Sequence, residues 1–185
     1  MILPIYTYGQ PVLREKAKPV DEREPDLKQF IDDLFETMYS ADGIGLAASQ
    51  VGRPIRLLVI DADVMSENYP ECRFFKRVMI NPEIVEKSRE TVALEEGCLS
   101  FPGIHEKVSR AVRIRVRYLD ENRALKEETL EGFTARVVQH ECEHLDGEVF
   151  IDRILPIRRQ LNKGKLHAII KGTTTCAYRI KPVKK

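Results

Sequence analysis

The residues best suited to chemistry are His140 and His144, four positions apart in the stretch VVQHECEHLDGEVF over 137–150. Glu141 follows the first histidine and completes the H-E-x-x-H pattern of a metal-binding helix. At about 100° per residue, the two imidazoles lie only about 40° apart, so both can reach one ion while Glu141 flanks it. Cys142 falls about 200° from His140 and points away. Two ordinary histidines would give the same pattern, so a third ligand is needed to decide.

That third ligand does not follow on the same segment. Gly147 fits the metzincin proteases, but Phe150 stands where their third histidine would be, and phenylalanine cannot bind a metal. The stretch EEGCLSFPG offers Cys98 beside a glycine, and a thiolate is a good ligand for zinc or ferrous iron. Two histidines and a cysteine leave one coordination position open for water, as catalytic sites do. The alternative for Cys98 is a buried, unreactive thiol.

The composition indicates a soluble globular protein. The chain has 185 residues, 43% of them hydrophobic and 32% charged, which fits one domain with a real core. The aliphatic runs are far too short to span a bilayer, and the N-terminus does not read as a secretory signal. We therefore expect a cytoplasmic protein. In that compartment the four cysteines are more often reduced thiols or ligands than disulfides.

Charge is concentrated at the C-terminal end. Residues 153–185 carry ten lysines and arginines and no acid, so the first 152 residues carry a net charge of −9, although the whole chain is at +1. This segment is either a solvated tail or a surface that docks on RNA or another polyanion.

Hydrophobic periodicity predicts two long helices and one strand pair. Apolar residues recur at helical spacing over 27–38, and a second helix is expected over 133–145. The alternation in AVRIRVRYLD, residues 111–120, predicts a half-buried strand that returns over 124–131.

The remaining segments read less clearly. Further strands are expected over 55–61, on either side of Asn81-Pro82, and over 173–181, with a polar excursion over 63–75 and a short helix within 156–171. Strands and helices do not alternate as in a parallel α/β protein, so the predicted fold class is α+β.

The loop GIGLAASQ over 43–50 contains G-x-G-x-x-A, a variant of the dinucleotide-binding pattern. It follows a predicted helix instead of a strand, so we reject that interpretation. Gln50 remains as a neutral hydrogen-bond donor beside a closely approachable backbone, or as an ordinary loop residue.

Three segments together, GIGLAASQ, EGCLS and QHECEHLDG, in this order and spacing, resemble peptide deformylase. The opening ILPIYTYGQPVLREKAKPV is similar to that family as well, and the likeness covers about residues 2–155. It implies a deformylase-like α+β fold, with antiparallel and mixed sheets packed around a central metal-binding helix. We expect a single catalytic domain over 1–185, with its core over 2–155 and a basic extension over 156–185.

The resemblance also implies roles for individual residues. Cys98, His140 and His144 would hold one divalent metal, ferrous iron in the cell, with zinc, nickel or cobalt in purified protein. Glu141 would be the catalytic acid and base.

Further roles follow from the same likeness. The side chain of Gln50 and the backbone N–H of Leu99 would face the developing oxyanion. Two groups would surround the substrate and support the metal: a backbone and methionine-pocket set of Ile44, Gly45, Gly97, Phe133 and Val137, and a paired acid and base, Glu96 and Arg110, whose alternative is a plain surface ion pair. His105 departs from the family pattern, because many members carry an arginine there.

The implied activity is removal of the formyl group from N-formylmethionine on nascent bacterial-type proteins, with release of formate. Metal-bound water can be acidic enough to act as a nucleophile near pH 7, and Glu141 can take its proton and pass it to the leaving amine. The partners would be the nascent chain and, through the basic C-terminal segment, the ribosome, with no membrane and no cognate DNA. The competing readings are a metallopeptidase that cleaves internal peptide bonds, a structural zinc module, and a Cys98 nucleophile with His140 as its base.

Overall fold

The computed structural model describes residues 1–183, and the terminal Lys184 and Lys185 of the basic segment lie outside the described residues. Its largest element is an antiparallel five-stranded sheet in the order β2-β3-β4-β7-β8. A separate hairpin pairs β5 with β6, and the short β1 and β9 pair in parallel. The strand bounds are β1 Ile5–Tyr6, β2 Gly45–Ala47, β3 Leu57–Asp61, β4 Lys76–Lys87, β5 Thr91–Gly97, β6 His105–Ala111, β7 Arg113–Leu119, β8 Leu125–Glu131 and β9 Ile180–Lys181.

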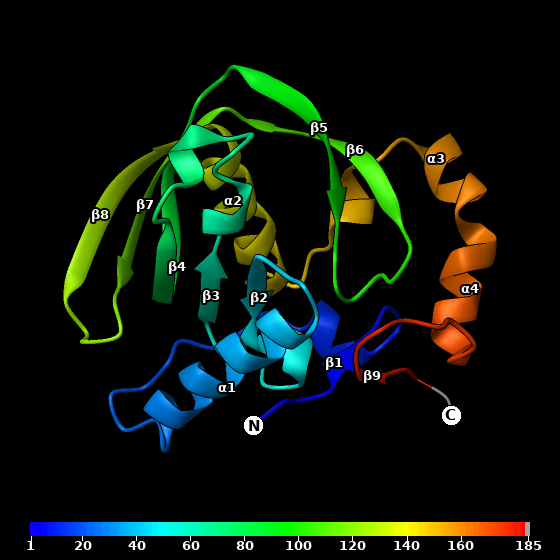
Figure 1. Ribbon diagram of the computed structural model, residues 1–185, viewed down its shortest axis with the longest axis horizontal. Helices are drawn as coiled ribbons and strands as arrows, with labels where there is room; N and C mark the ends of the chain where they lie inside the picture. Colours follow the sequence, from blue (N-terminus) through cyan, green and yellow to red (C-terminus); the bar gives the residue numbers. More distant parts are fainter. Residues whose placement is uncertain (184–185) are drawn as a thin grey trace.

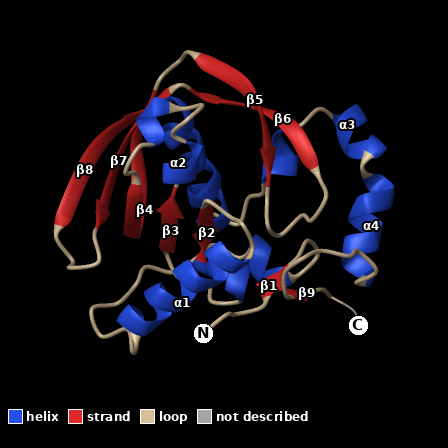
Figure 2. Ribbon diagram, in the orientation of Figure 1, coloured by secondary structure: helices blue, strands red, loops and turns tan. Residues whose placement is uncertain are grey.

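Helix α2 lies between the large sheet and the β5–β6 hairpin, as Figure 1 and Figure 2 show. Short 3₁₀ turns, two of them within the excursion 63–75, connect the larger elements. Among residues 1–183, no helix is long and apolar enough to cross a membrane. The α-helix bounds are α1 Leu27–Ser40, α2 Gly132–Leu145, α3 Pro156–Leu161 and α4 Lys163–Lys171.

Strand β3 explains how the two long helices are held. Its side chains alternate between the faces of the sheet, as in any strand. Leu57 and Val59 pack in the cluster that contains the apolar face of α1. Leu58 and Ile60 pack in the cluster that contains the apolar face of α2. Because both faces are covered, the strand is a continuous apolar run, and α2 is fixed on a rigid support.

A third apolar cluster lies beyond the end of α2. Phe101 and Phe150 meet there edge to face, with ring centroids 5.3 Å apart. Leu166 and Ile169 of α4 are buried in the same cluster. This cluster therefore ties the loop after β5, the segment after α2 and the C-terminal helix together.

The α+β class is confirmed, and so are the most periodic elements. Helices are found at 27–40 and 132–145, and β7 and β8 form the predicted antiparallel pair, with Leu119 opposite Leu125. The expected strand over 55–61 is also present, although it begins at Leu57.

Three expectations about other elements are wrong. Asn81-Pro82 does not split β4, because the strand continues through a register shift between Ile80 and Glu83 that accommodates a residue with no backbone N–H. The single helix expected within 156–171 is two helices that meet at Asn162. Of the strand expected over 173–181, only Ile180–Lys181 is extended and paired, and the residues before it cross the surface as a loop.

Candidate metal centre and active site

Helix α2 carries the H-E-x-x-H residues on the side that faces away from the large sheet. The helix begins at Gly132 and ends at Leu145, and every side chain from Thr134 to Leu145 is buried. Its apolar stripe, which includes Val138 and Leu145, packs on the sheet. Cys142 lies in that stripe, where burial raises the pKa of its thiol to about 12, so the prediction that it points away from His140 and His144 is consistent with the fold.

Cys98 meets the two histidines across the end of β5. The ligand atoms of Cys98, His140 and His144 all lie within 4.8 Å of one another, which is close enough for one ion. The sulfur of Cys98 lies 3.2 Å from Nε2 of His144, and the two imidazole centroids are 5.2 Å apart. A thiolate and two imidazoles form a donor set that suits zinc or ferrous iron. Nδ1 of the buried His144 has no hydrogen-bond partner among residues 1–183, so no competing protein acceptor fixes that ring.

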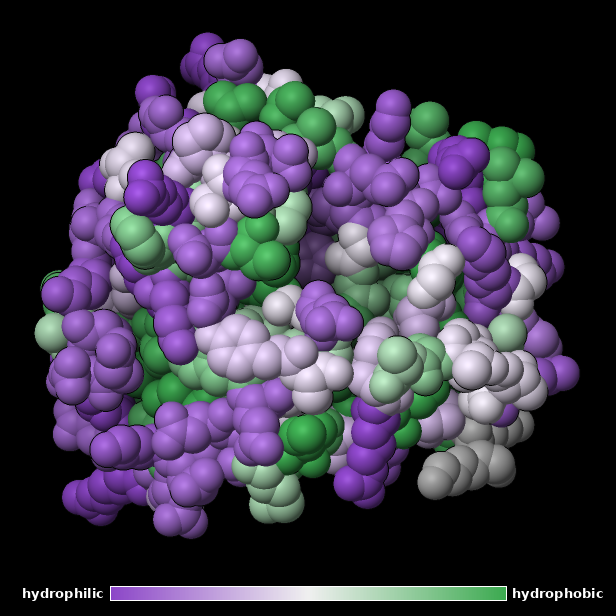
Figure 3. All heavy atoms as spheres, in the orientation of Figure 1, coloured by the Kyte–Doolittle hydropathy of each residue, from purple (hydrophilic) through white to green (hydrophobic). Residues whose placement is uncertain are grey.

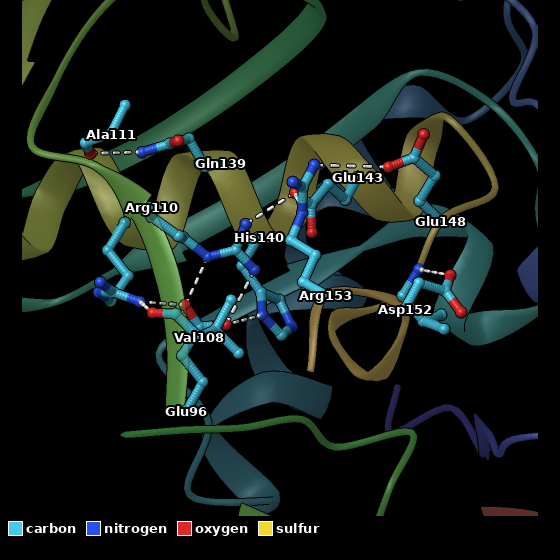
Figure 4. Close-up of polar contacts among 12 residues, drawn as sticks. Glu96, Val108, Arg110, Ala111, Gln139, His140, Glu143, Glu148, Asp152 and Arg153 are labelled. Carbon is cyan, nitrogen blue, oxygen red and sulfur yellow. Dashed lines mark hydrogen bonds and ion pairs between the residues drawn. The ribbon is translucent and has the colours of Figure 1, made fainter. Parts of the chain in front are cut away.

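A buried charge network supports the first histidine. Glu96 on β5 accepts a hydrogen bond from Nδ1 of His140 at 2.9 Å, which leaves Nε2 of that ring for a metal. Arg110 on β6 grips the same carboxylate with two nitrogens, and Arg136 on α2 donates to it at 2.6 Å. Arg110 also donates to Glu143 at 2.7 Å (Figure 4).

The network is deeply buried, so the alternative of a plain surface ion pair for Glu96 and Arg110 is wrong. Their side chains are only 6% and 1% exposed. Burial alone would raise the pKa of Glu96, but hydrogen bonds from His140 and Arg110 hold that pKa well below its usual range. Burial opposes protonation of His140, whereas contacts with Cys98 and Glu96 raise its pKa above the ordinary value. Burial, with the charge of His140 beside it, lowers the pKa of His144.

Glu141 occupies a tight place between α2 and β2. A Cβ atom built on Gly45 would lie 2.5 Å from Oε1 of Glu141, so only glycine allows the strand to pass this close. Its Oε2 is buried and has no partner among residues 1–183. Burial raises the pKa of the carboxyl to about 7. A carboxyl with that pKa exchanges protons readily near neutral pH.

Gln50 is oriented by its own loop. Its carbonyl oxygen accepts from the backbone N–H of Ala47 at 2.8 Å, which turns the amide nitrogen toward Cys98 and Ser100. That nitrogen lies 3.6 Å from the sulfur of Cys98 and 3.2 Å from the hydroxyl oxygen of Ser100. The backbone N–H of Leu99 makes no hydrogen bond with any residue from 1 to 183. Two donors are therefore available beside the metal ligands.

A cavity of about 570 Å³ opens at this centre. Figure 3 shows the surface hollowed between the β5–β6 hairpin and the central part of the molecule. Each residue of the predicted backbone and methionine-pocket set lines it, as do Gln50, Cys98, Leu99, His140 and Glu141. Val137 also belongs to the main core, and Phe133 stacks on Tyr69 with ring centroids 4.3 Å apart, so both pocket residues also pack in the fold.

Two strand edges border the cavity. Within residues 1–183, β2 pairs only with β3, and β5 pairs only with β6, so each has one unpaired edge. Gly45 belongs to the first and Gly97 to the second, and both line the cavity. His105 is an exposed residue that lies over Gly97 at the rim, because a Cβ atom there would come within 2.8 Å of its ring.

Sequence reasoning missed Arg136, Glu143, Ser100 and Tyr178. The first two could have been suspected, because Arg136 lies one helical turn before His140, and Glu143 is a charged residue in a helix that the fold buries completely. Nothing in the local sequence pointed to Ser100 or Tyr178, since the first acts through Gln50 and the second lies 79 residues from its partner Leu99.

The fold and the site together define an α+β protein with one cysteine and two histidines placed to bind a metal beside a buried glutamate. The sequence model of the polypeptide deformylase family matches residues 2–160. The chain belongs to the peptide deformylase family and is an enzyme of that type.

Individual relatives match nearly the whole chain. Peptide deformylase of Christiangramia forsetii is 42% identical over 98% of this chain and 96% of its own length, and that of Salinibacter ruber is 45% identical over 96% and 93%. Among solved structures, a peptide deformylase from Legionella pneumophila superposes with a TM-score of 0.82 at 37% identity, covering 94% of this chain and 98% of that one. The Thermotoga maritima enzyme gives 0.76 at 45% identity, covering 84% and 99%.

Proposed function

We propose that this enzyme removes the formyl group from N-formylmethionine at the start of nascent polypeptides and releases formate. The observation that carries the proposal is the convergence of Cys98, His140 and His144 on one point, with buried Glu141 beside them. The cavity reaches that point from the surface, as a catalytic site requires and a structural zinc site does not.

We propose Cys98, His140 and His144 as the ligands of one divalent metal, with ferrous iron as the ion in the cell and zinc, nickel or cobalt able to replace it in purified protein. When bound, such a cation lowers the pKa of water from 15.7 toward about 7 and so supplies a nucleophile at neutral pH. The network of Glu96 and Arg110 would keep the His140 ring in the orientation that presents Nε2.

Glu141 is the group proposed to move the proton. Its pKa of about 7 suits a carboxylate that takes a proton from the attacking water and delivers it to the leaving amine. The amide nitrogen of Gln50 and the N–H of Leu99 would donate to the oxygen of the formyl carbon as negative charge develops there. Removal of one such donor typically slows an enzyme by roughly 10²–10³-fold.

The nascent chain would bind as an extended strand between the unpaired edges of β2 and β5. Peptides commonly add to open strand edges through main-chain hydrogen bonds, with pockets for alternate side chains. Ile44, Gly45 and Gly97 would supply the main-chain contacts, and Ile44, Phe133 and Val137 the apolar wall for the methionine side chain. His105 at the rim would contact residues further along the substrate.

The chain would act as one catalytic domain in the cytoplasm. Its basic C-terminal segment, which includes α3 and α4, would contact the ribosome. Deletion of residues 173–185 is a poor test of that contact, because Thr175, Cys176 and Tyr178 line the cavity. Charge reversal at exposed Lys171 tests it better, and unchanged ribosome affinity at low salt would count against this helix end as a contact.

Release of formate from a formyl-Met tripeptide tests the proposed function. Anaerobically purified protein loaded with ferrous iron should turn it over, while the same peptide with an N-acetyl group and unfolded casein should stay intact. Digestion of casein would favour the metallopeptidase reading instead. Absence of formate despite one bound metal per chain would refute the deformylase proposal.

A further inference from the structure

The C-terminal segment returns to the active-site cavity after α4. Figure 1 shows it running back from α4 toward β1, where β9 pairs in parallel. On the way, Thr175, Cys176 and Tyr178 become part of the cavity lining. These residues lie beyond residue 160, where the match to the family model ends. The end of this chain therefore builds one wall of the site.

The loop that carries Cys98 and Leu99 is held through its carbonyl groups. The carbonyl oxygen of Cys98 accepts from the N–H of Phe101 at 2.8 Å, and that of Ser100 accepts from the N–H of Tyr8 at 2.9 Å. Between them, the carbonyl of Leu99 accepts from the phenolic O–H of Tyr178 at 2.7 Å. Of these three carbonyls, only the middle one depends on a side chain, and that side chain comes from the C-terminal segment.

The segment is itself anchored on both sides of Tyr178. The N–H of Thr173 donates to the carbonyl of Ala168 at 3.0 Å, next to the end of α4. On the other side, the N–H of Ile5 donates to Arg179 at 2.9 Å, and the side chain of Gln10 donates to the carbonyl of Pro182 at 2.9 Å. A phenol held at both neighbouring points can restrain the peptide that it contacts.

We propose that Tyr178 is a positioning residue that fixes the Leu99 peptide, so that the Leu99 N–H stays aimed at the oxygen of the formyl group. This rests on the proposed function, because it assigns to Leu99 the oxyanion contact. Loss of the phenolic hydroxyl leaves the chemistry in place but frees the donor to move, and a misplacement of about 1 Å can cost about 100-fold in rate.

The test compares Tyr178→Phe with Tyr6→Phe. The matched control also loses a phenol that contacts the C-terminal segment, since Tyr6 accepts from Nζ of Lys181 at 2.9 Å, but it does not touch the loop of Leu99. In iron-loaded enzyme, we expect Tyr178→Phe to lower kcat about tenfold, with KM within about twofold and metal content unchanged. Tyr6→Phe should leave kcat within about twofold of the wild type.

A second readout does not depend on turnover. In zinc-loaded protein labelled with ¹⁵N-leucine, the NMR order parameter of the Leu99 amide should fall in Tyr178→Phe and stay at the rigid-backbone value of about 0.85 in Tyr6→Phe. This also separates the two proposals: if the wild type releases no formate, the proposed function fails, while the Leu99 amide still reports whether Tyr178 anchors the loop.

Three results would overturn the assignment. An unchanged kcat together with an unchanged Leu99 order parameter in Tyr178→Phe would show that the hydrogen bond restrains nothing. Equal losses of kcat in both variants would make the segment a general clasp. A change confined to KM would make Tyr178 part of the substrate-binding wall instead.

Discussion

Arginine and glutamate pair in two regions of this protein, with opposite surroundings. On β7 and β8, Arg115 and Arg117 both contact Glu127, and all three side chains are between 36% and 47% exposed. Under the candidate metal site, Glu96, Arg110 and Arg136 are at most 6% exposed and share their partners with His140. The residue types are the same, so burial and shared partners decide what each pair does.

Exposed pairs contribute little to stability because water screens them and long side chains must be ordered. A buried network is different: removing one member leaves the others charged and unpaired away from water. The buried network also orients a proposed metal ligand, whereas the exposed ladder touches nothing in the site. We therefore expect the two regions to respond very differently to the same substitution.

The largest effect is expected from Glu96→Gln. The change leaves Arg110 and Arg136 buried without their shared carboxylate and removes the acceptor of the His140 Nδ1 proton. We expect a loss of about 3–5 kcal/mol in the free energy of unfolding of the metal-free protein, and a 10–100-fold loss in metal affinity. Urea denaturation and competition with a metal indicator would measure these. A change below about 1 kcal/mol would mean that the network does not differ from the surface ladder.

Acid titration should sharpen the same contrast. The pKa of Glu96 is held far below its ordinary value of 4.5 in the folded protein, so the folded state binds a proton there less readily than the unfolded state. Its stabilising contribution is therefore complete above about pH 4.5 and is lost as the pH falls below that value. Denaturation of metal-free wild type and Glu96→Gln should show a stability gap that narrows from pH 5 toward pH 3. A gap that widens on acidification would contradict this assignment.

The smallest effect is expected from Glu127→Gln in the exposed ladder. Arg115 and Arg117 keep contact with water, so the free energy of unfolding should change by less than about 0.5 kcal/mol. Even that change should shrink in 1 M salt, where the screening length falls to about 3 Å. A loss comparable to that of Glu96→Gln, measured by the same urea denaturation, would show that burial does not account for the difference.

How far the sequence predicts the structure depends on periodicity. Helix α2 and the pair β7–β8 have regular apolar spacing, and both were predicted nearly to their ends. The β5–β6 hairpin was not predicted, because its inward positions include the charged Glu106 and Arg110 instead of an apolar series. Those charges face inward because partners wait there, which is a tertiary fact that no local pattern contains.

The site shows the same division. The spacing of His140, Glu141 and His144 defines one half within five residues, and a likeness of motifs was needed to bring in Cys98 from 42 residues away. The contributions of Arg136 and Tyr178 could not be predicted, because each acts through a partner that only the fold brings near. The C-terminal end was misjudged as a longer strand since TTTCAYRIK has strand-forming residues, yet most of it crosses the cavity wall.

The most direct test of the central claim measures bound metal and formate release in the same samples of wild type, Glu141→Gln and Cys98→Ser. We predict one ion per chain and turnover in the wild type. Glu141→Gln should keep the ion but lose roughly 10²–10⁴-fold in kcat, because the proton carrier is gone while the ligands remain. Cys98→Ser should lose the ion. Full turnover in Glu141→Gln, or a tightly bound ion in Cys98→Ser, would contradict the account.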